Sequence, residues 1–404
     1  MPVKTIADWQ PDPGMPVLVR VDFNVPLRSD GRVLDDRRIR KAMPTIRRII
    51  DAGGIAVCMS HLGRPAGIGP EKGLSLAPVA EALRGLLGSA HSLYFVERAC
   101  RGERAQAVVD AANEGDVVLL DNLRFEAGEK AGDPDFAADL AALGRAWVND
   151  AFGTAHRDDA SMVAVPMAMQ SRPRVAGLLL DRELRFLGEA IASPARPFVA
   201  VLGGAKVSDK LGAIRNLLKL VDAIVVGGGM AYTFLAAQGD AIGDSLIERD
   251  MVQTATELLA EAGAAGKAMH LPTDHVCAQR IGTGVHTRVC VGDVPDGWMG
   301  LDIGPATIEA FTGVLEHAST VVWNGPMGVF ETSPFDAGTR AVAMALQGAT
   351  ERGAVTIVGG GETAAAVEAA GVAEHLSHVS TGGGASLRML EGTPFASVAC
   401  LEQA

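Results

Sequence analysis

The sequence predicts an α/β protein with two parallel-sheet domains, and three observations support this prediction. Apolar runs typical of strands alternate with helical patterns along nearly the whole chain, the order that parallel sheets with crossover helices require. The 404 residues exceed the length at which a single core usually stops growing, so two domains of roughly 150–200 residues are expected. The residues after the strands also change along the chain, from arginine and histidine to runs of glycine.

Strands are predicted where short apolar runs end at polar or glycine residues. These runs are 17–21, 55–60, 117–120, 146–149, 198–202, 223–226, 320–322, 355–358 and 378–380. Helices are predicted between them from spacing and capping residues. Apolar residues recur at helical spacing over 38–50, and Pro78 and Gly88 bound a second helix. Asp133 and Pro134 begin a third helix as its N-cap and first residue.

A helical segment near 182–192 is the expected domain boundary. It ends in Ser193-Pro194-Ala195-Arg196-Pro197, a proline-marked stretch typical of exposed linkers. Arginine and histidine follow the strands before this segment, and glycine follows those after it. We therefore expect one domain at 1–180 and a second from 181 onward.

The composition predicts a globular, cytoplasmic protein. Hydrophobic residues make up 48% of the chain, which is enough for two cores, and the net charge of −12 disfavours nucleic acid and anionic membranes as partners. The five cysteines show no CxxC or CxxH spacing, which argues against a disulfide framework or a zinc site and for a reducing compartment. No signal-peptide pattern is expected at the N-terminus.

The sharpest motif of the second half is Gly203-Gly204-Ala205-Lys206-Val207-Ser208-Asp209-Lys210. Glycine lets the backbone approach a phosphate, and a following helix would offer unpaired amides. Lys206 and Lys210 are four residues apart, so on a helix their ammonium groups would share one face. Lysines at a helix start oppose the helix dipole, which favours an anion between them over a merely solvated basic turn.

Two further turns carry candidate nucleotide ligands. Gly359-Gly360-Gly361-Glu362-Thr363 is either a capped helix start or a site where amides hold phosphate oxygens and Glu362 binds Mg²⁺. In the turn at 323–331, Glu331 is a candidate acceptor for ribose hydroxyls. Neither a Walker A sequence nor GxGxxG is complete, which argues against a P-loop and a dinucleotide site.

Basic residues follow four predicted strands of the first half. They are His61, Arg64, Arg124, His156 and Arg157, joined by Arg38 at the start of the helix over 38–50. Guanidinium groups match carboxylates and phosphates bidentately. Any one of these arginines alone would suggest only a surface residue. Asp22 and Asn24 add acceptors for a substrate hydroxyl, so the set predicts a site for a small anion.

No Ser-His-Asp order, nucleophile elbow or metal-ligand cluster is visible in the sequence. A reaction that needs two anion sites but no protein nucleophile is phosphoryl transfer. Positioning and charge neutralisation do most of the work in that reaction. Two other classes stay open: a non-catalytic sensor of the same ligands, and an NAD-dependent oxidoreductase of the same fold class. Cys58 is expected in the core rather than as a nucleophile.

Together these motifs resemble the phosphoglycerate kinase family. The matching segments are Val19–Pro26, His61–Pro65, Leu123–Glu126, Asp150–Arg157, Gly203–Lys210, Gly227–Phe234, Trp323–Glu331 and Thr381–Ser386. They are collinear from about residue 17 to residue 392. The resemblance implies two doubly wound, Rossmann-like domains joined by a hinge helix near 182–192: a phosphoglycerate-binding domain at 1–180 and a nucleotide-binding domain at 181–389. It also implies that the tail at 390–404 packs back on the first domain.

The resemblance implies reversible Mg²⁺-dependent phosphoryl transfer from 1,3-bisphosphoglycerate to ADP, giving 3-phosphoglycerate and ATP. The enzyme would be a hinge-bending cytoplasmic monomer of glycolysis, gluconeogenesis or carbon fixation. The implied substrate residues are Asp22, Phe23, Asn24, Arg38, His61, Leu62, Gly63, Arg64, Arg124 and Arg157. The implied nucleotide residues are Gly204, Lys206, Asn324, Glu331, Gly360, Gly361, Glu362 and Thr363. The implied catalytic residues are Arg38, Lys206, Lys210, Gly359 and Gly382, with Glu362 as the metal ligand.

Two positions depart from the family pattern. Glu362 stands where the family usually has aspartate, so the carboxylate is one methylene longer; binding of Mg²⁺ through water, or an altered metal preference, is therefore open. Asp158 and Asp159 follow Arg157 where the family commonly has a neutral residue and then histidine or a small residue. These two carboxylates either weaken the hold of Arg157 on an anion or lie outside the site.

Overall fold

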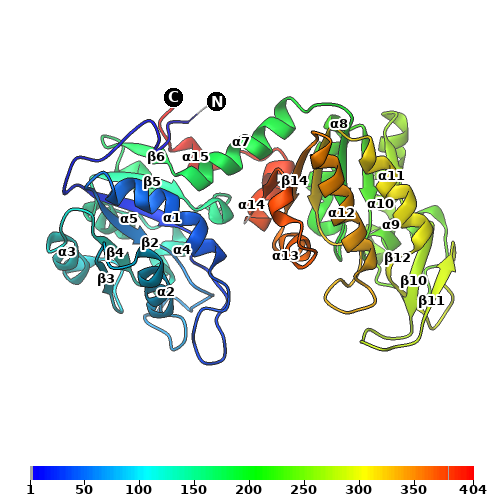
Figure 1. The fold of residues 1–404 in the computed structure, drawn as a ribbon, viewed down its shortest axis with the longest axis horizontal. Coiled ribbons are helices and arrows are strands. Elements are labelled where there is room, and N and C mark those ends of the chain that lie inside the picture. The colour runs from blue at the N-terminus through cyan, green and yellow to red at the C-terminus, as the bar shows by residue number, and fades with distance from the viewer. Residues whose placement is uncertain (1–2, 381) are drawn as a thin grey trace. The chain divides into compact units, whose positions relative to one another are not determined.

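The computed structural model describes residues 3–380 and 382–404, so Thr381 of the last glycine turn lies outside the described residues. The chain forms two compact units (Figure 1). The first comprises Met1–Arg185 and Pro394–Ala404, and the second comprises Phe186–Thr393. Helix α7 (Leu178–Ala192) contains the point at which one unit gives way to the other. Among the described residues, no helix is long and apolar enough to cross a membrane.

The first unit is built on a parallel sheet with the strand order β3-β4-β2-β1-β5-β6. Its strands are β1 (Pro16–Val21), β2 (Ile55–Met59), β3 (Leu93–Val96), β4 (Val117–Leu120), β5 (Ala146–Asp150) and β6 (Arg174–Ala176). Its helices are α1 (Arg37–Ile50), α2 (Ala77–Leu87), α3 (Gly102–Asp110), α4 (Ala127–Ala131), α5 (Pro134–Ala142), α6 (Ala164–Ala168) and α15 (Ala396–Ala399), with 3-10 turns η1 (Leu123–Phe125) and η2 (Phe152–Thr154).

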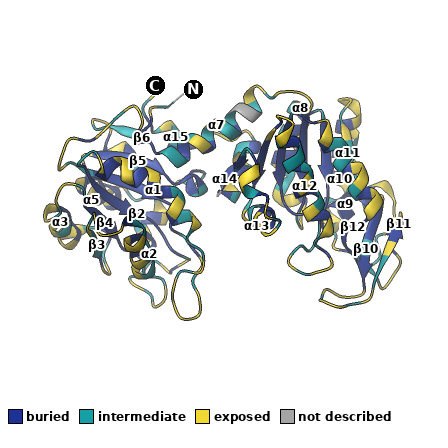
Figure 2. Cartoon of the chain, in the orientation of Figure 1, coloured by how far each residue is buried: buried dark blue, intermediate teal, exposed yellow. Residues whose placement is uncertain are grey.

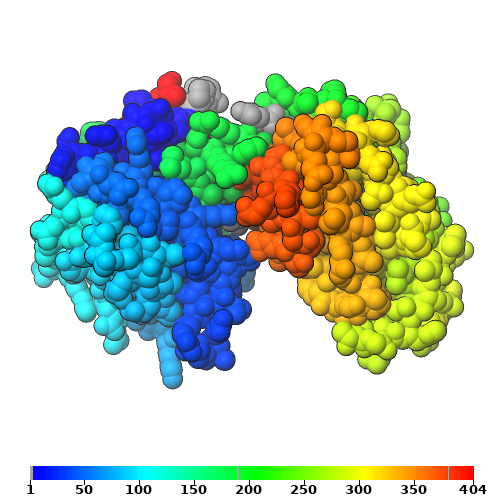
Figure 3. Space-filling model, viewed as in Figure 1, coloured from blue at the N-terminus to red at the C-terminus, as the bar shows by residue number. Residues whose placement is uncertain are grey.

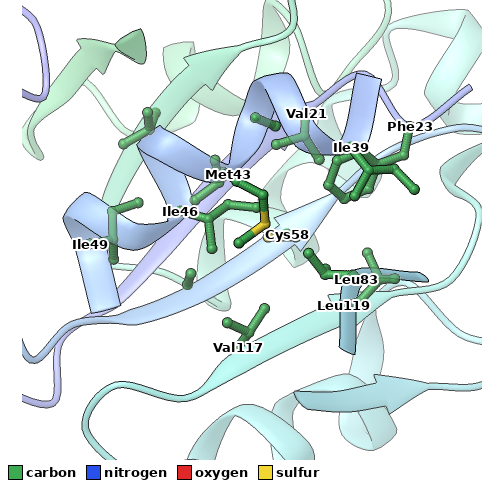
Figure 4. Packing of buried hydrophobic residues seen from close by; sticks show 14 of the residues in the cluster. Val21, Phe23, Ile39, Met43, Ile46, Ile49, Cys58, Leu83, Val117 and Leu119 are labelled. Carbon is green, nitrogen blue, oxygen red and sulfur yellow. The ribbon is translucent and has the colours of Figure 1, made fainter. Parts of the chain in front are cut away.

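The core of the first unit lies where helices pack on the sheet. In Figure 4, Ile39, Met43 and Ile46 of α1 point toward the side chains of Cys58 and Val21 on the strands. The central strands are buried along nearly their whole length, which explains their continuous apolar sequences (Figure 2). Complete burial of each such aliphatic side chain contributes about 1.5–3 kcal/mol.

The C-terminal segment belongs to the first unit. The backbone N–H of Lys4 donates to the carbonyl oxygen of Glu402 at 2.8 Å, and that of Glu402 donates to Arg174 at 2.9 Å. Ser397 Oγ donates to the carbonyl oxygen of Ala155 at 2.7 Å. Figure 3 shows the red C-terminal residues at the surface beside the dark-blue N-terminal segment. These contacts tie both ends of the chain to one sheet.

The second unit contains a parallel sheet with the order β15-β14-β13-β7-β8-β9. Its strands are β7 (Phe198–Leu202), β8 (Ala223–Val226), β9 (Ala268–His270), β13 (Thr320–Asn324), β14 (Val355–Gly359) and β15 (His378–Val379). The helices are α8 (Leu211–Leu220), α9 (Ala231–Gln238), α10 (Val252–Ala264), α11 (Pro305–Glu316), α12 (Ala337–Glu351), α13 (Gly361–Ala369) and α14 (Gly383–Leu390), with 3-10 turns η3 (Ser208–Lys210), η4 (Arg249–Met251) and η5 (Ala373–His375).

The predicted fold class of two parallel-sheet α/β domains is confirmed. A small antiparallel sheet in the second unit was not predicted; it has the order β11-β10-β12, formed by β11 (Thr287–Val291), β10 (Asp274–Ala278) and β12 (Met299–Ile303). Its strands carry Arg288, Asp274 and His275, so they lack the apolar runs by which the other strands were recognised. The predicted N-cap is confirmed, since Asp133 accepts the backbone N–H of Phe136 at 2.7 Å and Pro134 opens α5.

Candidate active site

Both parallel sheets reverse their winding direction at one place, and ligands bind at such places in open α/β sheets. In the first unit the chain passes from β1 to β2 on one side and later places β5 on the other side of β1. In the second unit β8 and β13 flank β7 in the same way. The loops after β1 and β5, and those after β7 and β13, therefore border the two crevices. All four loops carry residues that the sequence singled out.

The loop after β1 holds Asp22, Asn24 and Arg38 together. Arg38 Nη1 donates to Asp22 Oδ2 at 2.8 Å and to the carbonyl oxygen of Asn24 at 3.1 Å. Asn24 Oδ1 accepts the backbone N–H of Gly63 at 2.9 Å, which joins this loop to the one after β2. The Arg38 side chain is one-third exposed, so its guanidinium keeps an accessible face for an anion.

Arg124 joins the same cluster from the loop after β4. Its Nη1 donates to the carbonyl oxygen of Gly63 at 3.3 Å, and its Nη2 donates to Asp159 Oδ2 at 3.2 Å. The Arg124 Nε is buried without a protein partner. Arg157, from the loop after β5, also has a buried Nε without a partner. Both side chains therefore keep a donor available for a ligand.

His61 is buried among these arginines and is not a cation. Burial holds the pKa of His61 far below its ordinary value, and so do four nearby guanidinium groups, those of Arg20, Arg124, Arg157 and Arg38. The sequence prediction that His61 contributes positive charge is therefore wrong. A low pKa leaves a neutral imidazole with one N–H donor and one acceptor.

Phe23 and Leu62, two residues of the implied substrate set, have their side chains in the hydrophobic core. Their backbones are bonded within the protein: the Phe23 N–H donates to Ser60 Oγ at 2.9 Å, and the Leu62 carbonyl accepts from Asn122 Nδ2 at 2.7 Å. Arg64 is exposed at the surface of the same loop. Asn122 was not predicted as a site residue, because an asparagine after a strand forms no distinctive pattern.

Asp159 is part of this cluster. Of the two alternatives left open for this departure from the family pattern, the contacts favour a carboxylate inside the site. Its carboxylate pairs with Arg124 while both side chains are almost fully buried. Burial lowers the pKa of Arg157 and so does Arg124, while Asp159 raises it, so Asp159 also lies within electrostatic reach of Arg157. The carboxylate thus reduces the positive charge of the site.

The turn after β7 differs from its sequence prediction. Lys206 precedes the 3-10 turn η3, so Lys206 and Lys210 do not share a helix face. The amides at the helix start are also not free: Glu248 accepts the backbone N–H of Ser208 at 3.0 Å, its hydroxyl at 2.5 Å, and the backbone of Val207. These amides therefore already have an internal carboxylate as their acceptor.

The glycines of this turn are required by close packing. A Cβ on Gly203 would overlap the carbonyl oxygen of Pro326 in the loop after β13. Gly204 has φ +92°, a left-handed conformation that favours glycine. Its carbonyl oxygen accepts the backbone N–H of Met230 at 3.0 Å. These contacts hold the loops after β7, β8 and β13 against one another.

Lys210 and Asn324 form the polar centre of the second site. Lys210 Nζ donates to Asn324 Oδ1 at 2.6 Å. Burial lowers the pKa of Lys210, and the charges of Asp209 and Glu362 partly oppose that shift. Asn324 Nδ2 is buried without a protein partner. An unpaired donor beside a half-desolvated ammonium favours an anion at this place.

Two helix N-termini lie beside this centre. Helix α13 begins after Gly360, whose φ of +101° favours glycine, and α14 begins after Gly382. A Cβ on Gly383 would lie 3.1 Å from the backbone nitrogen of Gly361, so the two helix starts are in close contact. Thr363 Oγ1 accepts the backbone N–H of Gly325 at 2.7 Å and fixes α13 to the loop after β13. The first amides of a helix lack partners within it and attract anions.

A cavity of about 430 Å³ opens beside these helix starts within the second unit. Gly204, Glu331 and Glu362 line it, and its walls are mainly apolar. The other lining residues include Gly228, Gly229, Tyr232, Leu246, Leu301, Met327 and Val329. An apolar cavity of this size, bordered by a few polar groups, suits a flat heterocyclic ligand. Tyr232, Leu246 and Leu301 were not predicted as ligand residues, because single apolar residues give no motif.

Glu362 is exposed at the start of α13. In the described part of the chain, no three His, Cys, Asp or Glu side chains are grouped to hold a metal on their own. Mg²⁺ usually takes one or two carboxylates together with substrate phosphates. A single accessible carboxylate beside the cavity fits that mode of binding.

Buried unpaired donors lie at one edge of each of the two parallel sheets, and a cavity that suits a heterocycle lies at one of them. These are features that a phosphotransferase requires. The family model of phosphoglycerate kinase matches residues 11–393. The chain is 51% identical to the phosphoglycerate kinase of Rhodopirellula baltica over 96% of both chains, and 51% identical to that of Chloroflexus aggregans over 99% of both.

Solved structures agree with these relatives. The phosphoglycerate kinase of Coxiella burnetii superposes with a TM-score of 0.87 at 36% identity, covering 99% of this chain and 98% of that one. The enzyme of Pyrococcus horikoshii gives a TM-score of 0.83 at 28% identity, with 98% of each chain covered. The chain therefore belongs to the phosphoglycerate kinase family, and it is a kinase of glycolysis that uses ATP or ADP.

Proposed function

We propose that this protein transfers a phosphoryl group reversibly from the acyl phosphate of 1,3-bisphosphoglycerate to ADP, giving 3-phosphoglycerate and ATP. The observation that carries this proposal is the pairing of two anion sites of different character. One has arginines with unpaired buried donors, and the other has a lysine beside two helix starts and a cavity. The attacking atom is already an anionic oxygen, so the reaction requires no general base.

Phosphoglycerate would bind in the crevice of the first unit. Arg38, Arg124 and Arg157 offer donors to its phosphate and carboxylate, and Asp22 and Asn24 offer acceptors to its hydroxyl. The backbones of Phe23, Leu62 and Gly63 shape the crevice. Arg64 is accessible, so it would contact the substrate from the surface.

The nucleotide would bind in the second unit, with its base in the cavity. Lys206, Lys210 and Asn324 would face the phosphates, as would the amides of Gly360, Gly361 and Thr363. Glu331 would accept ribose hydroxyls. Glu362 would hold Mg²⁺ together with the phosphates; when bound, the ion neutralises phosphate charge and fixes its orientation.

In the transition state, Arg38 and Lys210 would neutralise the phosphoryl group, and the helix starts at Gly359 and Gly382 would donate amides. The attacking oxygen must come within about 3–3.5 Å of the phosphorus atom that is transferred. We propose that bending at α7 brings the two sites together and excludes water. We also propose that the enzyme acts as a cytoplasmic monomer, which its free cysteines and negative charge support.

A coupled assay tests the proposal. Purified protein with MgATP and 3-phosphoglycerate should yield an acyl phosphate, which an NADH-dependent dehydrogenase then reduces. NADH oxidation that needs all three components is the expected result. A sensor would bind both ligands without NADH oxidation, and an oxidoreductase would consume a nicotinamide cofactor without ATP.

A further inference from the structure

A buried polar chain of three residues leads to His61, and none of the three was predicted as a ligand residue. Arg20, in β1, is fully buried, and its Nε donates to Ser161 Oγ at 2.8 Å. Ser161 Oγ donates to Glu129 Oε1 at 2.6 Å, and the Ser161 backbone N–H donates to Glu129 Oε2 at 2.9 Å. Ser161 and Glu129 are also fully buried. The chain ends at the imidazole, where Arg20 Nη2 lies 3.3 Å from His61 Nδ1.

The chemistry of each group fixes the direction of these hydrogen bonds. A guanidinium has only donors, so His61 Nδ1 must accept from Arg20. The remaining ring proton is then on Nε2. Ser161 Oγ accepts from Arg20, so its own proton is directed to Glu129. Both oxygens of Glu129 accept, as an ionised carboxylate requires.

The charges around His61 favour the same state. The charged groups that face the imidazole are guanidinium groups from β1, α1, η1 and the loop after β5, those of Arg20, Arg38, Arg124 and Arg157. Burial lowers the pKa of His61 most, and these guanidinium groups lower it further. Burial raises the pKa of Glu129, while Arg20 and Ser161 oppose that shift. Glu129 in turn raises the pKa of Arg20, so the two charges stabilise each other.

We propose that Arg20 is a positioning residue that holds His61 as the neutral Nε2–H tautomer, with Ser161 and Glu129 fixing Arg20 in place. His61 then serves phosphoglycerate as a directional hydrogen-bond donor and not as a cation. This role rests on the proposed function. The contribution of His61 to substrate affinity should not change between about pH 5 and pH 8, where histidines ordinarily titrate.

Nitrogen NMR of the full-length protein tests the tautomer without substrate. His61→Gln identifies the signals of the ring. We expect an unprotonated Nδ1 and a protonated Nε2 across that pH range. Because this measurement needs no turnover, its result stands even if the coupled assay fails. A protonated Nδ1, or a ring with both nitrogens protonated, would overturn the proposal.

Variants of the chain separate positioning from folding. In Arg20→Met, His61 should titrate closer to its ordinary pKa, and the KM for 3-phosphoglycerate should become pH-dependent by roughly three- to tenfold while kcat changes less. Arg104→Met, on the exposed face of α3, is the matched control. If Arg20→Met does not fold, Ser161→Ala can be used instead. It removes only the hydrogen bond that holds Arg20, and both neutral tautomers of His61 should then be populated. An unchanged tautomer in whichever variant folds contradicts the proposal.

Discussion

The guanidinium of Arg124 and the carboxylate of Asp159 form a buried ion pair, with Nη2 and Oδ2 3.2 Å apart. The pair places a negative charge inside a site that would bind a multiply charged anion. Such a carboxylate fixes the arginine side chain in the free protein, and it also repels an anionic substrate. Asp159 would then weaken ground-state binding and favour product release.

Asp159→Asn should tighten 3-phosphoglycerate binding by about three- to tenfold at low salt, because one negative charge leaves a poorly screened site while an acceptor for Arg124 remains. Titration calorimetry at two salt concentrations measures this. The free variant should also lose about 1–3 kcal/mol of stability, since Arg124 keeps a buried charge with a weaker partner. Weaker or unchanged binding would show that the pair has no such effect.

Lys210→Ala should lower kcat about 10²- to 10³-fold, with nucleotide affinity changing less than about threefold, because the ammonium is proposed to act on the phosphoryl group in transfer. Steady-state kinetics and nucleotide binding measure the two quantities separately. Lys219→Ala, an exposed lysine in the last turn of α8, is the control. Equal losses in kcat and affinity would assign Lys210 to ground-state binding alone.

Glu362→Gln should raise the Mg²⁺ concentration for half-maximal activity by about tenfold, since the amide is a poorer magnesium ligand. Glu362→Asp should stay close to the parent, because it keeps the charge. Magnesium titration of the coupled assay provides the measurement, with Glu374→Gln in η5 as the control. A magnesium requirement that is the same in all three variants argues against Glu362 as the ligand.

Asp150 should make stability pH-dependent. Its Oδ1 accepts the backbone N–H groups of Leu179 and Leu180 at the start of α7, and burial raises its pKa to about 7 from 3.8. The folded state therefore binds a proton that the unfolded state releases, so this group favours folding at low pH and loses that contribution as the pH rises to about 7.

Asp150→Asn keeps the acceptor and removes the titration. The stability difference between variant and parent, measured by urea unfolding, should move in favour of the variant from pH 5 to pH 7 and then level off. Asp302, whose pKa burial also raises to about 7, is present in both proteins and cancels in this comparison. A difference that does not vary with pH would refute the assignment.

The sequence was sufficient for the parts of the fold that local patterns encode. Buried parallel strands are continuous apolar runs, and Asp133 and Pro134 mark a helix start by their own chemistry. The glycine turns were recognised because backbone conformation and close packing, as at Gly203 and Gly360, leave few other residues possible. The antiparallel sheet escaped prediction because charged residues or glycine interrupt the apolar sequences of its three short strands.

The errors at the site have a common cause: they concern contacts between residues that are distant in the sequence. Glu248 occupies the amides at Ser208 from a loop 40 residues away. Arg20 contacts Ser161 across 141 residues, and burial beside Arg20 and three other arginines lowers the pKa of His61. Charge state and hydrogen-bond direction depend on burial, which no local pattern of residue types reports.

Phosphorus NMR of the purified protein with MgATP and 3-phosphoglycerate observes phosphoryl transfer itself. We expect an acyl phosphate signal that grows as the γ-phosphate of ATP declines, and loss of this exchange in Lys210→Ala at unchanged nucleotide binding. Consumption of ATP that yields only inorganic phosphate, or binding of both ligands without any transfer, would contradict the proposed function.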